Sequence, residues 1–261
     1  MKTVLICHAD DPIGRDALAR WLASFSDLEG VVAIHEPAGR KWRRIRREVR
    51  RVGIIRFLDV LAFRLYYALW LRWQDQRWEA KRLSAIDAAY PAVTPATRAL
   101  ETSSPNSTEA EQFIRECLPD VIIARSKTLL ATRIFTIPSK GTFVMHPGIC
   151  PEYRNAHGCF WALASGDREH VGMTLLRIDR GVDTGPVYGY FHCDFNEITD
   201  SHVIIQNKVV LDNLDRLRDK LFEIAEGRAS TLDTSGRTST EWGQPWLTSY
   251  LAWKSRANQG G

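Results

Sequence analysis

The first residues of the chain alternate between short apolar runs and a segment with helical periodicity. The apolar run at residues 3–7 predicts a buried strand, and residues 30–34 predict a second strand. Between them, apolar residues recur at helical spacing over residues 16–25, which predicts an amphipathic helix. A strand, helix and strand in this order predict a βαβ unit with a parallel strand pair.

The same rhythm resumes further along the chain. Ser107 precedes a segment with two acids in its first turn, a typical helix start, and a short apolar run follows that helix. The pattern predicts an α/β fold with a largely parallel sheet that is mixed at one end. The further predicted elements are strands at residues 121–124, 141–145, 171–178 and 186–193, a helix at 157–165, and a long helix capped by Thr199 and Asp200 that runs to about Glu226.

We predict one principal domain at residues 1–227, interrupted by a helical and basic insertion at about 40–90. Residues 228–261 are polar and rich in Ser and Thr, so we expect them to form a C-terminal tail that packs on the domain through its aromatic side chains. These are Trp242, Trp246, Tyr250 and Trp253.

Composition and charge narrow the class of protein. The chain has 261 residues, of which 44% are hydrophobic, enough for a full core. Its five cysteines form neither a CxxC pair nor a regular framework, which favours a reducing compartment and a cytoplasmic location. The net charge of +4 comes from one segment, because residues 40–51 hold eight basic side chains and one acid.

Residues 53–71 of the insertion are strongly apolar, but Arg56, Asp59 and Arg64 interrupt them. Central charges disfavour a transmembrane helix, so we expect one or two amphipathic helices. The arginines could serve an anionic substrate such as a nucleotide sugar, the phosphates of tRNA, or association with an acidic membrane surface. Alternatively, the apolar face packs on the core or on a second subunit, as in a homodimer.

One histidine and one aspartate are the candidate reactive residues. His146 ends an apolar run and precedes Pro147 and Gly148, which place it in a turn at the carboxyl edge of the sheet, where α/β folds bind ligands. Asp183 lies between two glycines in a later loop. Such a pair suits proton-coupled acyl chemistry. No metal site is expected, since the histidine and cysteine spacings match no zinc pattern.

The chain resembles the N10-formyltetrahydrofolate-dependent formyltransferases, the family that includes methionyl-tRNA, glycinamide ribonucleotide and sugar N-formyltransferases. The resemblance implies a Rossmann-like formyltransferase fold with a mostly parallel sheet, mixed at one end, and here a helical insertion. Its motifs agree in order and spacing: Pro119-Asp-Val-Ile-Ile, Ile137-Pro138, Gly141, Pro151-Glu-Tyr-Arg154, Trp161, Gly166-Asp167, Gly172-Met-Thr174 and Gly181-Val-Asp-Thr-Gly-Pro-Val187.

The resemblance also implies the reaction, in which a formyl group passes from N10-formyltetrahydrofolate to the amine of a small polar acceptor, such as a nucleotide-linked amino sugar. In the family a histidine and an asparagine stabilise the oxyanion, and an aspartate manages the proton and keeps the histidine charged. His146 and Asp183 match the histidine and the aspartate. The implied cofactor-binding residues are Ile123, Arg125, Lys127, Gly181, Val182 and Thr184, and the implied substrate-binding residues are Tyr153, Asn155 and His157.

Three departures from the family pattern leave the chemistry open. Val144 occupies the asparagine position and cannot donate a hydrogen bond, Asn155 replaces a usual glycine, and residues 125–127 replace an apolar, glycine-containing loop. Either Asn155, His157 or a backbone amide restores the donor, or the reaction has changed, for example to hydrolysis of a formyl group or another one-carbon or acyl transfer. A non-catalytic binding or membrane-surface protein is the third alternative. The stretch after Gly227 is too short for the C-terminal domain of the tRNA enzymes, so a nucleic-acid partner is not expected.

Overall fold

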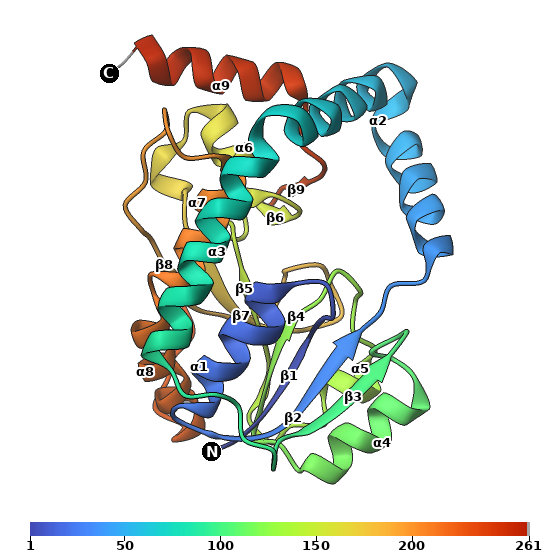
Figure 1. Cartoon of the computed structure of the whole chain (residues 1–261), viewed down its shortest axis with the longest axis vertical. Coiled ribbons are helices and arrows are strands. Elements are labelled where there is room, and N and C mark those ends of the chain that lie inside the picture. The colour runs from blue at the N-terminus through green and yellow to red at the C-terminus, as the bar shows by residue number, and fades with distance from the viewer. Residues whose placement is uncertain (260–261) are drawn as a thin grey trace.

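The computed structural model describes residues 1–259, except the side chains of residues 38 and 40–44. Within these residues, a seven-stranded sheet with the order β3-β2-β1-β4-β5-β7-β8 forms the centre of the molecule (Figure 1). The pairs from β3 to β5 are parallel and the last two pairs are antiparallel, which confirms the predicted sheet with a mixed end. The strands are β1 Lys2–His8, β2 Asp27–Ile34, β3 Arg98–Thr102, β4 Val121–Arg125, β5 Gly141–His146, β7 Met173–Arg177 and β8 Val187–Phe191.

Helices cover both faces of the sheet because the central strands are apolar on both sides. In β1, Leu5 and Cys7 face one core layer, whereas Val4 and Ile6 face the other. The first layer contains residues of η1, α1, α6, α7, α8 and α9, and the second contains residues of α4 and α5 (Figure 1). These elements are η1 Ile13–Leu18, α1 Ala19–Ala23, α4 Thr108–Cys117, α5 Thr132–Phe135, α6 Gly158–Ser165, α7 His202–Leu211, α8 Leu214–Ala225 and α9 Leu247–Gln259; η3 Arg168–His170 is a short 3₁₀ turn after α6.

One predicted helix was wrong, and one strand of the sheet was not predicted. The helix expected to run from Thr199 and Asp200 to about Glu226 is two helices, α7 and α8. Its cap is Ser201, whose hydroxyl accepts a hydrogen bond from the Ile204 amide, and it breaks at Asn213, whose side chain donates to the carbonyls of His192 and Val209. Strand β3 was not predicted, because most of its residues are exposed at the edge of the sheet and lack the apolar signal of a buried strand.

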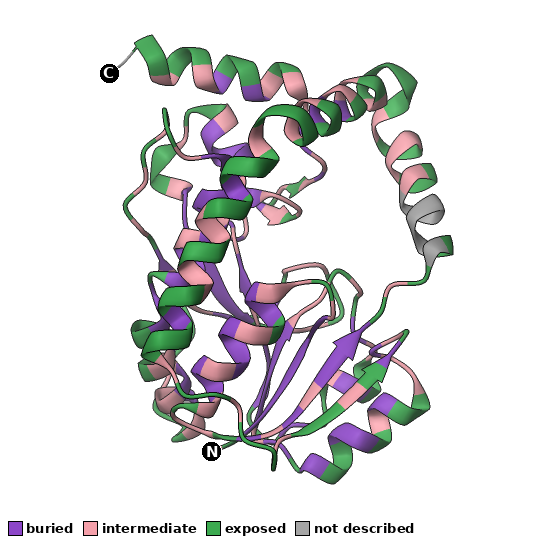
Figure 2. Cartoon of the chain, viewed as in Figure 1, coloured by how far each residue is buried: buried purple, intermediate pink, exposed green. Residues whose placement is uncertain are grey.

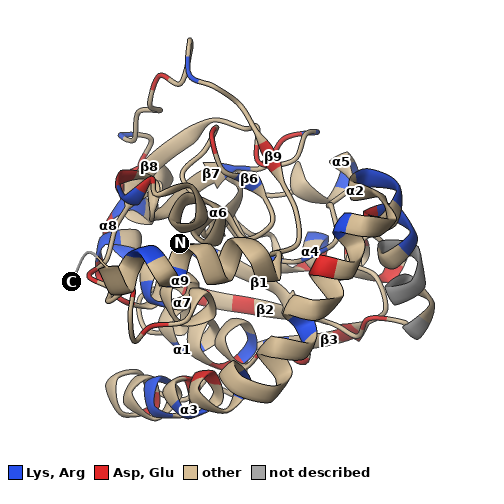
Figure 3. Ribbon diagram, turned by 90° about the horizontal axis from the view of Figure 1, so that it is seen from above, with Lys and Arg blue, Asp and Glu red and all other residues tan. Residues whose placement is uncertain are grey.

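The insertion forms two long helical segments. Helix α2 spans Ala38–Tyr66 and is interrupted at Gly53, whose φ of 79° is not helical. The π-helical segment η2, Tyr67–Leu71, joins it to α3, Arg72–Ala89, which returns along the sheet domain (Figure 1). In Figure 3, blue segments follow the grey part of α2, and in the sequence the described basic residues there are all arginines. Of the predicted basic segment 40–51, the side chains of Arg40, Lys41, Arg43 and Arg44 lie outside the described residues.

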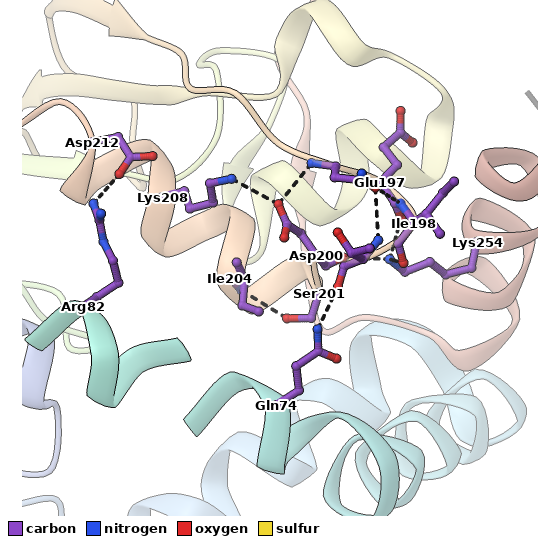
Figure 4. A network of polar contacts seen from close by, with 12 residues as sticks. Gln74, Arg82, Glu197, Ile198, Asp200, Ser201, Ile204, Lys208, Asp212 and Lys254 are labelled. Carbon is purple, nitrogen blue, oxygen red and sulfur yellow. Dashed lines mark hydrogen bonds and ion pairs between the residues drawn. The ribbon is translucent and has the colours of Figure 1, made fainter. Parts of the chain in front are cut away.

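Polar contacts fix the second half of the insertion to the start of α7. The amide of Gln74, which Figure 4 shows beside the start of α7, donates to the Thr199 carbonyl over 2.8 Å. The Ser201 hydroxyl donates to the buried Asp75 carboxylate over 2.6 Å. Across residues 1–259, no helix is long and apolar enough to cross a bilayer.

The residues after 227 return to the domain through their aromatic side chains. Trp253 is completely buried and donates its indole N–H to Glu197, and Tyr250 is buried beside it. The short strand β9, Glu241–Trp242, pairs in parallel with β6, Arg154–Asn155. Figure 2 shows the buried residues of α9 in purple.

Candidate active site

His146 and Asp183 are brought together beside the end of β5. His146 is the last residue of β5, and the loop between β7 and β8 brings Asp183 back towards that end, so that His146 Nδ1 lies 3.4 Å from an Asp183 carboxylate oxygen. Both side chains are largely buried. Motifs separated along the sequence therefore meet at one place in the fold.

The second ring nitrogen of His146 fixes the tautomer. Its Nε2 lies 2.8 Å from the Tyr153 carbonyl oxygen, and because a carbonyl can only accept, Nε2 carries a hydrogen. Nδ1 then faces the Asp183 carboxylate, which repels an unprotonated nitrogen and attracts an N–H. At 3.4 Å, this contact is longer than an ordinary N–H···O hydrogen bond.

Asn155 orients the carboxylate from the other side. Its backbone N–H donates to Asp183 Oδ2 over 2.8 Å. Both residues have left-handed backbone conformations, with φ of 76° at Asn155 and 51° at Asp183, which Asn and Asp tolerate better than most residues. This explains how asparagine can replace the glycine of the family pattern. The Asn155 side chain donates to the Trp242 carbonyl over 2.6 Å and to Glu241 over 3.2 Å, so β9 holds it.

A pocket of about 80 Å³ adjoins the carboxylate. Val144 and Asp183 both line it, so the position of the missing family asparagine faces the same space as the aspartate. The predictions did not include most of its walls, although these residues directly flank the predicted segments. The lining residues are Ala124, Ser126, Thr128, Leu129, Leu130, Val144, Leu176, Ile178, Asp179, Arg180, Gly181 and Asp183.

The cofactor residues expected in the later loop lie in or around this pocket. Gly181 lines it directly. Thr184 donates its hydroxyl to Asp179, which also accepts from the Gly181 amide, and this bonding shapes the turn. The carbonyl of Val182 accepts from Arg154 over 2.8 Å and faces the β6 segment.

The cofactor residues expected around the end of β4 adjoin the pocket without lining it themselves. Ile123 is completely buried in the core layer beneath α6 and α7. Arg125 forms a 2.5 Å ion pair with Asp11 in the loop after β1, and the Lys127 amide donates to the His8 ring. The pocket wall on this side comes instead from neighbours such as Ala124 and Ser126 in the same segment.

The three residues expected to bind the acceptor are held by other contacts. Tyr153 is buried and donates its hydroxyl to Asp167, and its pKa is raised by burial. His157 takes a left-handed conformation before α6, and its ring lies 5.9 Å from that of His202. Burial lowers the pKa of His157 to about 4, so the ring is neutral near pH 7. Neither Asn155 nor His157 is among the residues that line the pocket, and the Asn155 side chain is bound to β9.

Among the described residues, no group of three or more His, Cys, Asp or Glu side chains is arranged to hold a metal ion. Cys150 and Cys159 are buried, and burial raises the pKa of each thiol to about 12. These thiols are therefore protonated near neutral pH and poorly suited as ligands or nucleophiles.

The chain matches a family model described as formyl transferase over residues 74–214. Methionyl-tRNA formyltransferase of Thermus thermophilus is 32% identical over 143 residues, which cover 51% of this chain and 44% of that protein. The enzyme of the same name from Dehalococcoides mccartyi is 37% identical over 81 residues, 31% of this chain and 26% of that protein. The chain thus spans less than half the length of these curated relatives.

Solved structures share the fold over nearly the whole chain. A sugar N-formyltransferase from Shewanella sp FDAARGOS_354 superposes with a TM-score of 0.55 and 14% identity, covering 98% of this chain and 88% of that one. Phosphoribosylglycinamide formyltransferase from Anaplasma phagocytophilum gives a TM-score of 0.53 at 13% identity, covering 94% and 98%. The architecture is therefore the Rossmann-like formyltransferase fold that the motifs implied.

Proposed function

Because the chain belongs to the formyl transferase family, we propose that it transfers a formyl group from N10-formyltetrahydrofolate to the amine of a small polar acceptor, with a nucleotide-linked amino sugar as the first candidate. The observation that carries the proposal is the His146 and Asp183 pair beside a pocket between two loops. The pocket suits part of a flat, partly apolar ligand, because Val144, Leu176 and Ile178 supply aliphatic walls next to polar backbone.

When bound, N10-formyltetrahydrofolate supplies the activated formyl carbon. Asp183 is placed to accept the proton that the attacking amine loses as its nitrogen forms the new C–N bond. His146 is placed to donate from Nδ1 to the formyl oxygen while Nε2 stays on the Tyr153 carbonyl. The proton taken up by Asp183 returns, through His146 or directly, to the departing nitrogen, so the protein ends the cycle unchanged.

The test measures release of tetrahydrofolate by the purified protein mixed with N10-formyltetrahydrofolate and candidate amino sugars. We expect amine-dependent release by the wild type and a loss of at least about 10²-fold in Asp183→Asn. Asp215→Asn, in an exposed carboxylate on α8, is the matched control and should leave the rate unchanged. Equal turnover by the wild type and Asp183→Asn would reject the mechanism.

Val144 supports a second candidate, hydrolysis of a formyl group. The pocket wall at this position lacks the amide donor of the family, so an altered acceptor such as water is compatible with the remaining His146 and Asp183 pair. The same assay separates the two. Formate released without any amine identifies hydrolysis, whereas a formylated amine identifies transfer.

A further inference from the structure

The insertion exposes a continuous apolar face that we call the apolar stripe. Its aliphatic members follow one another at intervals of four, three, four and four residues, which places them on one side of the helical segments. They are between 41% and 72% exposed, and green residues mark this region in Figure 2. The stripe consists of Ile54, Leu58, Leu61, Leu65 and Leu69, with the exposed Trp70 and Trp73 at its end. An exposed apolar patch of this extent indicates a contact surface.

The opposite side of the same helices is anchored to the domain, so the stripe faces outward. Val60 and Phe63 are buried, and Phe63 packs against Tyr250 of α9. Asp59 accepts hydrogen bonds from the backbone and hydroxyl of Thr248. These contacts leave the stripe without a cover within the described residues.

The acidic and the basic side chains of the insertion differ in the direction that they face. Residues 45–79 contain eight arginines and four acids. Each acid is directed at the protein: Glu48 accepts from the Gln244 amide, Asp59 binds Thr248, Asp75 binds Ser201, and burial raises the pKa of Glu79.

Two of the arginines also make contacts on the domain side, since Arg51 pairs with Glu48 and Arg56 lies over the Trp246 ring, but the others are exposed. Arg64, Arg72 and Arg77 are exposed and lie close to stripe residues in the sequence, and Arg46, Arg47 and Arg50 are exposed in the preceding part of α2. The Arg77 guanidinium lies over the Trp73 ring, 4.7 Å from its centroid. The outward charge bordering the stripe is therefore positive.

We infer that the apolar stripe and its bordering arginines bind the surface of an anionic phospholipid bilayer, with the helices lying in the plane of the interface. Aliphatic side chains would enter the acyl boundary, Trp70 and Trp73 would sit at the headgroup level, and the arginines would pair with lipid phosphates.

Charge complementarity favours an anionic bilayer over a second copy of the chain or a nucleic acid as the partner of the stripe. A second copy docked on the same stripe would bring arginine borders against arginine borders, and like charges repel. A nucleic acid would satisfy the arginines but leave the leucines exposed. An anionic bilayer satisfies both parts of the surface.

The test is co-sedimentation of the full chain with vesicles of phosphatidylcholine alone and with vesicles containing phosphatidylglycerol. We expect binding only to the anionic vesicles. Arg64→Gln/Arg72→Gln/Arg77→Gln should lower the partition coefficient by roughly 100-fold, and Leu58→Gln/Leu61→Gln/Leu65→Gln by more than about 10-fold. The matched controls are Leu118→Asn, in an exposed leucine after α4, and Arg218→Gln/Arg228→Gln near the ends of α8, and both should bind like the wild type.

A second measurement keeps the test independent of folding defects. Lipids brominated in their acyl chains should quench the fluorescence of the wild type, and Trp70→Phe/Trp73→Phe should lose most of that quenching while still sedimenting. Absence of binding to anionic vesicles overturns the inference, as does full binding by the leucine variant, which would indicate charge attraction alone. A dimer in solution that the leucine variant abolishes would assign the stripe to a second copy and would equally overturn it.

Discussion

The backbone N–H of Asn155 donates to the Asp183 carboxylate over 2.8 Å, and the Asn155 side chain is held in turn by the Trp242 carbonyl. One residue thus connects the proposed proton acceptor to strand β9 in the C-terminal part of the chain. The orientation of Asp183 relative to His146 depends on this connection as well as on the β7–β8 loop.

The left-handed backbone at Asn155 predicts different outcomes for two small replacements. Asn155→Gly and Asn155→Ala both lose the side-chain bonds to β9 and both keep the backbone N–H. Alanine is also strained at the positive φ of this position, so Asn155→Ala should be about 1–2 kcal/mol less stable than Asn155→Gly. Urea unfolding of the two variants measures this difference, and equal stabilities would show that the backbone relaxes.

The position of Val144 predicts a gain of activity. Val144→Asn places an amide donor in the pocket that Asp183 lines, and one such donor is worth about 10²- to 10³-fold in rate. We expect the kcat of formyl transfer to rise towards that limit in Val144→Asn. Val144→Ala, which removes volume without adding a donor, should not show the gain. If both variants are equally slow, position 144 does not contact the reacting oxygen.

The buried histidines predict a loss of stability in mild acid. Burial lowers the pKa of His157 to about 4 and that of His202 well below its usual 6.5. Between pH 6.5 and 4 the unfolded chain therefore binds more protons than the folded chain. Stability then rises with pH, and it is lost as pH falls from 6.5 towards 4, with a slope of about 1.4 kcal/mol per pH unit for each histidine.

The contribution of His202 can be isolated by comparison with His202→Phe. Its ring is surrounded by the aromatic residues Phe63, Phe160 and Tyr250, so phenylalanine fits the site. Denaturant titrations at several pH values give the free energy of unfolding as a function of pH. Between pH 6.5 and 4, its slope should be smaller in the variant by the contribution of one histidine, about 1.4 kcal/mol per pH unit. Identical slopes would mean that His202 does not resist protonation in the folded state.

The buried tail predicts a large effect on stability from a residue far from the pocket. Trp253→Ala removes a completely buried side chain and its bond to Glu197, and it should cost about 3–5 kcal/mol. Leu251→Ala, in an exposed residue of the same helix, should stay within about 0.5 kcal/mol of the wild type. Thermal and urea unfolding compare the pair, and similar effects would indicate that α9 contributes little to the cooperative unit.

Local patterns predicted the parts of the fold in which neighbouring residues cooperate. The apolar runs identified most strands of the sheet, and the motifs around His146 and Asp183 indicated that the two meet. The predicted helix boundaries were wrong where a single side chain determines them. Ser201 caps α7 in place of Thr199 and Asp200, and Asn213 lies at the break between α7 and α8. Such contacts give no periodic signal.

The environment of the pocket could not be predicted because it depends on long-range contacts. Nothing near Asn155 in the sequence shows that its amide is bound by residues of β9. Likewise, Arg125 is drawn towards Asp11 in the loop after β1, although its position in the motif placed it with the cofactor residues.

The parallel pairing of β6 with β9 has a consequence for how the protein matures during synthesis. Asn155 leaves the ribosome 87 residues ahead of its partner Trp242. At usual translation speeds this interval lasts roughly 4 to 17 s. During that time Asp183 emerges and can meet His146, but Asn155 lacks the strand that holds it. The nascent domain can therefore form its sheet first, whereas the arrangement around the carboxylate is completed only after β9 has been translated.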